Sequence, residues 1–337
     1  MKPKAPFSPQ QSGVTLIELM VSLVIGMIIM VAVISAYIGA SGASRVAEAT
    51  GRMNEDAQMA LSILSQQLRM AGVNPSQPNR SSVTTATANL RGNSVPLHNT
   101  VTNAYSIRGC DVKFSDVTTA TTTSALTCGH SSSSFGTAPS SVAIAYEADR
   151  YNTIPTSSGA PTDCVGSSAG TMTFNFNNSQ GVASSTTVAE VENRFYIGTS
   201  THVVNPTLYC KGNGNTIPQP MVENIEDIQI KYGTIDPTEP VIYKSATTVT
   251  VTAAQVRGYL TANEVDTDAT KLTGAAGSAS RWNAVKTVRV CVLARSESQL
   301  FETATAATYL NCAGTTVTPT DRRLRRAYTT TVILRNQ

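Results

Sequence analysis

The sequence predicts an α+β protein in which one long N-terminal α-helix packs on an antiparallel β-sheet with long, disulfide-stapled loops. Three observations support this fold class. An uncharged run at residues 19–40 continues into an amphipathic stripe that stops before Gly72. Beyond it, short segments alternate apolar and polar residues between stretches rich in Ser, Thr and Gly. All 6 cysteines lie after the helix.

The uncharged run has 22 residues and would form a helix of about 33 Å, long enough to cross a bilayer. Glu18 stands directly before it, after a leader at residues 1–13 that carries Lys2 and Lys4 but no acid. A signal peptide is one interpretation, but its apolar core is usually about 7–15 residues. A plain membrane anchor is a second, with Glu18 at the interface.

A third interpretation gives Glu18 a purpose. Cleavage after Gly13 would create a new α-amine on Val14, four residues before Glu18 and on the same helix face. In a membrane or a packed bundle, an ammonium needs a carboxylate partner. Helices staggered lengthwise would then pair the Val14 amine of one chain with Glu18 of its neighbour.

The run GVTLIELMV at residues 13–21 resembles the class III signal of type IV prepilins and type II secretion pseudopilins. In that family a prepilin peptidase cuts after the glycine and methylates the new N-terminus. The resemblance therefore implies cleavage between Gly13 and Val14, methylation of Val14, and a docking role for Glu18 between subunits. Val14 stands where the family usually has Phe, which bears on the efficiency of processing.

The helix is predicted to continue to residue 71. Residues 45–71 carry one apolar stripe, formed by Met53, Ala57, Ala60, Leu61, Leu64 and Leu68. Gly72 and Pro75 then predict its end. The expected organisation is a cleaved leader at 1–13, a transmembrane and filament-core half at 14–43, an amphipathic half at 44–72, and a β-rich globular domain at 73–337.

Strand patterns become clear only after a polar region at residues 73–141, where one short strand is expected near 105–108. The predicted strands are 142–146, 171–176, 195–197, 207–210, 228–232, 285–294 and 328–334. Residues 234–281 look like an insertion with a short helix at 256–264. We expect the last two strands to pair in antiparallel fashion at an edge.

The six cysteines are Cys110, Cys128, Cys164, Cys210, Cys291 and Cys312. Sequence alone allows 15 connectivities. We favour sequential pairing because it staples local loops, and free buried thiols are the alternative. Disulfides indicate an oxidising compartment, and the basic leader keeps the N-terminus cytoplasmic. Together they predict a periplasmic body.

The composition gives little support to catalysis or nucleic-acid binding. Net charge is +3, and removal of Lys2 and Lys4 leaves 23 bases against 22 acids. His98, His130 and His202 each stand alone in polar sequence, so we expect no enzyme, metal or cofactor. Two weaker alternatives remain. Asp266 and Asp268 could contribute to a calcium site, and the arginine cluster at 322–326 could bind DNA phosphates.

Further blocks resemble the PilW family of minor pilins, at residues 146–149, 163–166, 223–233, 282–296 and 326–336. The resemblance implies a minor pilin that initiates type IV pilus assembly in a tip complex. Its expected partners are prepilin peptidase, other minor pilins, the major pilin and a tip adhesin. It would lie in the bacterial inner membrane and later at the pilus tip, supporting adhesion and twitching motility. A type II secretion pseudopilin and a DNA-uptake or receptor pilin are the alternatives.

Overall fold

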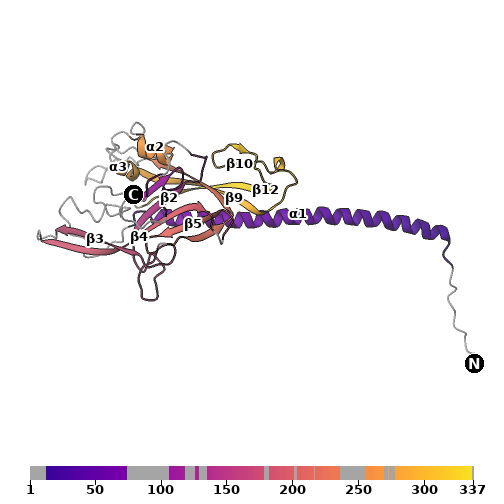
Figure 1. Ribbon diagram of the computed structural model, residues 1–337, viewed down its shortest axis with the longest axis horizontal. Helices are drawn as coiled ribbons and strands as arrows, with labels where there is room; N and C mark the ends of the chain where they lie inside the picture. Colours follow the sequence, from indigo (N-terminus) through magenta and orange to yellow (C-terminus); the bar gives the residue numbers. More distant parts are fainter. Residues whose placement is uncertain are drawn as a thin grey trace, which may run out of the picture. The chain divides into compact units, whose positions relative to one another are not determined.

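A computed structural model of the chain describes residues 13–73, 106–117, 126–128, 135–177, 182–200, 203–215, 217–235, 255–268, 272 and 278–335. The predicted α+β class is confirmed: a long helix and antiparallel strands account for most of this part of the chain (Figure 1). The chain divides into two compact units, Met1–Ala49 and Thr50–Gln337. His98, His130, His202 and Pro75 lie outside the described residues.

Helix α1 runs from Leu16 to Met70 without interruption. Its first half is long and apolar enough to cross a membrane. Its second half buries the predicted stripe at Met53, Ala57, Ala60, Leu64 and Leu68, while Leu61 is only partly buried. The amphipathic pattern therefore predicted correctly which face of the helix enters the core.

The end of α1 is hydrogen-bonded into a sheet. Gly72 adopts φ 73°, a left-handed conformation that glycine tolerates at a helix C-terminus. Its N–H donates to the carbonyl oxygen of Ala145 at 2.9 Å, and the carbonyl of Val73 accepts from the N–H of Glu147 at 2.9 Å. Residues 72 and 73 thus bond to strand β2 just beyond the residues of β2 that pair with β1.

The first sheet has six antiparallel strands in the order β1-β2-β4-β5-β6, and β3 pairs with β4. Their bounds are β1 Ile107–Cys110, β2 Ser141–Ala148, β3 Gly170–Asn177, β4 Ala183–Gly198, β5 Thr207–Gly212 and β6 Gln219–Glu223. Every residue of β2 is buried. The fully buried β2 is consistent with its place between two neighbours.

The second sheet has four antiparallel strands in the order β12-β9-β7-β8. Their bounds are β7 Ile225–Thr234, β8 Gly258–Leu260, β9 Val285–Gln299 and β12 Arg323–Ile333. The predicted antiparallel pair of the last two long strands is confirmed, and Val288, Val290 and Val292 are all buried. A small hairpin of β10 Tyr309–Leu310 and β11 Thr316–Val317 lies in the connection between them.

Two sequence expectations need correction. The strands form two large sheets rather than one, because the chain changes sheet between β6 and β7. The short helix predicted at residues 256–264 is replaced by β8 and by α2 Ala262–Thr267, with α3 Ser278–Asn283 after it. The side chain of Thr261 accepts from the N–H of Glu264, whose side chain accepts from the N–H of Thr261, and this capping box starts α2 later.

Asn224 is the single residue between β6 and β7, and it joins the two sheets. Its φ is 61°, the left-handed region that non-glycine residues rarely adopt. Its side-chain nitrogen donates to Asp56 of α1 at 3.4 Å, and its carbonyl accepts from the N–H of Arg295 at 2.9 Å. The corner is therefore bonded to the helix on one side and to β9 on the other.

Three disulfides staple the globular unit. They join Cys110 to Cys128, Cys164 to Cys210 and Cys291 to Cys312, with Cα–Cα distances of 5.5, 6.4 and 5.7 Å. This is the sequential pairing that we favoured from the sequence. No cysteine is left free. The first disulfide ties Cys128 to the last residue of β1, and the second ties a loop at residues 149–169 to β5.

Candidate functional site

The sequence at the start of α1 is the first candidate site. Gly13 and Val14 precede the helix and are exposed, with 72% of Val14 accessible to solvent. We expected Val14 and Glu18 on one helix face, but in the uncleaved chain the helix begins at Leu16. Val14 therefore lies before the first turn and presents an accessible bond to Gly13.

Glu18 caps the start of its own helix. The backbone N–H and the hydroxyl of Thr15 both donate to Glu18 Oε2 at 3.0 Å, and the N–H of Glu18 donates to Thr15 Oγ1 at 3.3 Å. This reciprocal arrangement is a capping box, and the Thr-x-x-Glu spacing could have revealed it from the sequence. Both described donors to Glu18 come from Thr15 and reach Oε2, so no hydrogen bond among the described residues engages Oε1.

Apolar side chains surround this carboxylate along the helix. Leu16 is 79% exposed, Ile17 is 70% exposed, and large apolar residues continue in the same state to Ile38. A continuous apolar surface of this length marks contact with a membrane or with other proteins. The site thus combines an accessible cleavage point, a carboxylate and an apolar helix.

Comparison with known families identifies two matching segments of the chain. Residues 8–34 match the prokaryotic N-terminal methylation motif, and residues 194–336 match the family described as Type IV Pilus-assembly protein W. The chain belongs to the PilW family. It is a type IV pilus minor pilin with an apolar N-terminal helix that fits a membrane anchor. Neither the curated proteins nor the solved structures gave a match to this pilin.

The arginine cluster of the pilin is engaged within the fold. Arg325 is buried and contacts Glu226 and Asp321, each at 2.5 Å. Arg323 donates to the carbonyl of Ser296 at 3.0 Å, and Arg322 donates to Gln299 at 2.8 Å. The hydrogen bond from Arg325 holds the pKa of Asp321 below its usual value. These contacts give Arg322, Arg323 and Arg325 structural roles, whereas Arg326 is exposed, and DNA binding by the cluster stays a prediction.

The calcium alternative concerns Asp266 and Asp268, and the structure gives side-chain contacts for Asp266. Asp266 accepts from Arg108 at 3.2 Å and from the indole N–H of Trp282 at 2.8 Å. These bonds tie the α2 and α3 segment to β1. In the part of the chain that the structure describes, no group of three potential metal-ligating side chains occurs.

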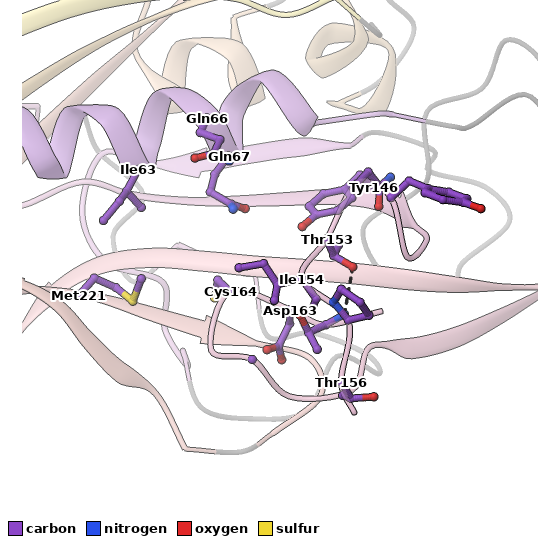
Figure 2. Close-up of a pocket in the computed structure, with 15 residues that line it drawn as sticks. Ile63, Gln66, Gln67, Tyr146, Thr153, Ile154, Thr156, Asp163, Cys164 and Met221 are labelled. Carbon is purple, nitrogen blue, oxygen red and sulfur yellow. Dashed lines mark hydrogen bonds between the residues drawn. The ribbon is translucent and has the colours of Figure 1, made fainter. Parts of the chain in front are cut away.

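A groove of about 610 Å³ lies in the globular unit of the pilin (Figure 2). Its wall on α1 is formed by Ile63, Gln66 and Gln67, and Met221 of β6 also lines it. The remaining lining residues are Tyr146, Tyr151, Asn152, Thr153, Ile154, Pro155, Thr156, Thr162, Asp163, Cys164 and Gly166. Sequence reasoning missed this groove because three distant segments build it.

Asp163 organises the loop beside the groove. Its Oδ1 accepts from the N–H groups of Val165 at 3.0 Å and Ser167 at 2.9 Å, and its Oδ2 accepts from Gly214 at 2.9 Å. The glycine-rich run at 211–215 therefore ends β5 and is held at Gly214 by this carboxylate. With Asp163 committed to backbone groups, the groove offers mainly amides, hydroxyls and apolar surface.

Proposed function

We propose that this minor pilin initiates type IV pilus assembly and forms part of the tip complex with other minor pilins. In that place it supports a tip adhesin, primes addition of the major pilin, and contributes to adhesion and twitching motility. The single observation that carries the proposal is the exposed Glu18 carboxylate at the mouth of an apolar helix, in a chain that carries a PilW domain. The role is structural rather than catalytic.

The proposed sequence of events begins at the inner membrane. Prepilin peptidase cuts between Gly13 and Val14 and methylates the Val14 amine. The apolar part of α1 anchors the pilin in the bilayer while the disulfide-bonded unit folds in the periplasm. Extraction into a filament then exchanges lipid contacts of the helix for contacts with neighbouring helices.

Docking follows from the geometry of the cap. Glu18 Oε2 remains hydrogen-bonded to Thr15, and Oε1 accepts a hydrogen bond from the α-ammonium group of a neighbouring subunit. A carboxylate and an ammonium that lose water must compensate each other, because an unpaired charge in an apolar bundle is costly. The pairing therefore sets the lengthwise stagger between adjacent helices.

Replacement of Glu18 by Gln tests this role. Glutamine also fits the third helical position of a capping box, so the helix start is kept while the charge is removed. We expect Glu18→Gln to be cleaved and membrane-bound but to enter sheared pili about tenfold less than wild type. Immunoblots of cell and pilus fractions measure this.

Thr15→Ala is the matched control, since it removes the hydroxyl of the cap but keeps the carboxylate. We expect it to assemble better than Glu18→Gln. Wild-type incorporation of Glu18→Gln would reject the docking role. Capture of the full-length pilin from membranes tests the complex: other minor pilins support it, and secretion components in their place would support the pseudopilin alternative.

A further inference from the structure

The outer edge of β12 is a strand edge without a partner in the part of the chain that the structure describes. The strand pairs with β9 on one side and ends the sheet on the other. Its register with β9 is unbroken from Arg325 to Ile333, with a shift only before Arg325. Figure 1 shows β12 beside β9 at the yellow, C-terminal end of the chain.

This edge lacks the features that usually protect a sheet from pairing with another chain. Proteins blunt edge strands with Pro, charged residues or bulges. Residues 327–334, with the sequence AYTTTVIL, contain 8 residues without a charge, a Pro or a Gly. Five of them are Thr, Val or Ile, which favour extended strands. The exposed side chains include Thr329, Thr331 and Ile333, the last 64% accessible.

The hydrogen-bond pattern identifies which backbone groups face outward. The N–H of Leu334 donates to the carbonyl of Lys286, the residue opposite it on β9, at 2.9 Å. Since bonding direction alternates along a strand, the even-numbered residues face β9. The N–H and C=O groups of Thr329, Thr331 and Ile333 therefore point to the outer edge.

Charge at the two ends of the edge indicates the kind of partner. Arg326 and Arg335 are both exposed and flank the uncharged run. A second copy of this edge, paired antiparallel about Thr331 so that the outward-facing backbone groups meet, would bring Arg326 and Arg335 of the two copies to the same ends of the ladder. It would bring no acid to them, because residues 322–335 contain five Arg and no Asp or Glu, and like charges at short distance repel. The edge therefore disfavours a second copy and fits a strand that carries acids at both ends.

We propose that the β12 edge of this pilin binds an extended segment of a different pilus subunit by strand addition, with an uncharged run bordered by carboxylates. The inference deepens the proposed function and rests on it for the existence of a partner subunit. Backbone bonds to Thr329, Thr331 and Ile333 would hold the segment. Arg326 and Arg335 would fix its register and orientation.

The test uses the full-length pilin in its own host. Thr331→Pro removes one outward N–H and leaves the inner ladder intact, because Thr331 does not bond to β9. Thr331→Val keeps the N–H and the side-chain shape. We expect Thr331→Pro to reduce co-capture of the partner subunit about tenfold, and Thr331→Val to leave it near wild type.

A photoreactive p-benzoylphenylalanine at position 331 identifies the occupant directly. The expected cross-linked peptide belongs to another pilus subunit and contains an uncharged run with Asp or Glu at both ends. A cross-link to position 331 of a second copy, to this chain itself, or to a helix of another subunit would overturn the proposal. Undiminished capture by Thr331→Pro would do the same.

Charge reversal covers the case in which Thr331→Pro fails to fold, as judged by loss of its disulfides on a non-reducing gel. The Arg326→Glu, Arg335→Glu double variant should lose the partner, whereas Lys113→Glu at an exposed loop should not. Capture unaffected by the double variant rejects the inference. If wild type captures no pilin at all, the proposed complex fails; if it does and the edge variants match it, only the strand-addition inference fails.

Discussion

At the scale of single residues, Tyr232 shows how tightly the second sheet is packed. It is fully buried, and its ring meets the Trp282 ring edge-on with centroids 4.8 Å apart. Its hydroxyl has no hydrogen-bond partner among the described groups. A side chain at Gly109 would overlap that hydroxyl, so the glycine of β1 is required for the close approach.

Two substitutions separate these effects. Tyr232→Phe removes a buried hydroxyl that makes no bond, so we expect the free energy of unfolding to be unchanged or slightly higher. Gly109→Ala adds a methyl group where the ring already lies and should destabilise by about 2–3 kcal/mol. Urea denaturation of the full-length pilin in detergent measures both. A destabilised Tyr232→Phe would show that the hydroxyl is bonded.

Residues differ in how far the sequence could predict them. Glu18 was named as a candidate because of its place in the motif at residues 13–21, and the six cysteines were predicted to pair in sequence order because that pairing closes local loops. The Thr15 cap was also present as a spacing but was overlooked. The groove beside Ile63, Asp163 and Met221 could not be predicted, since only folding brings those segments together.

At the scale of elements, the Asn224 corner decides where the chain leaves one sheet for the other. A left-handed backbone costs a residue with a Cβ about 1–2 kcal/mol, and Asn tolerates it better than most residues. The corner also receives bonds from α1 and β9. We infer that backbone conformation and hydrogen bonding both hold this position.

Matched variants at Asn224 separate the two contributions. Asn224→Gly keeps the backbone conformation and loses only the bond to Asp56, so a loss of under about 1 kcal/mol is expected. Asn224→Ala loses the bond to Asp56 and also disfavours the left-handed backbone, so it should cost about 1 kcal/mol more than Asn224→Gly. Thermal unfolding of the full chain provides the measurement. Equal stabilities would show that the corner does not depend on its conformation.

Among elements, long ones with a single dominant pattern were predicted best. The stripe of α1 and the alternation of β9 fixed their type and buried face. The short helix near 256–264 was misplaced because the capping box at Thr261 acts over only four residues. β6 escaped prediction because Gln219 and Pro220 weaken its strand pattern and its burial is slight.

At the scale of the whole molecule, partly buried acids make the stability of the globular unit depend on pH. Burial, and then the nearby charge of Glu192, raises the pKa of Glu190 to about 8. Burial also raises the pKa of Asp227 to about 6. In register, Glu190 of β4 lies opposite Glu147 of β2. The folded state therefore holds protons that the unfolded chain has lost.

The sign follows from linkage. Between the usual carboxyl pKa of 4.5 and the raised value of about 8, the folded state binds more protons, so stability falls as pH rises. We expect Glu190→Gln to raise the free energy of unfolding by about 2 kcal/mol at pH 8 and to match wild type near pH 5. Denaturation at several pH values measures this. The exposed Glu297→Gln is the control, and parallel pH curves for Glu190→Gln and wild type would contradict the assignment.

The division into two sheets was the largest feature that sequence could not supply. Strand patterns define which residues face a core, but they do not say which strands share a sheet. The chain changes sheet at one residue, Asn224, whose left-handed conformation leaves no trace in the apolar pattern. The order of one helix followed by many strands was enough to predict the class but not this topology.

The hydrogen bonds at the end of α1 also define a path for mechanical load. A filament subunit under tension is pulled through its helix, and Gly72 and Val73 deliver that pull to β2 through two backbone bonds. Gln67 couples the same helix to Asn193 of β4, and Asn54 couples it to Tyr328 of β12. Load would thus be shared between both sheets, so that traction on the pilus need not be carried by any single strand.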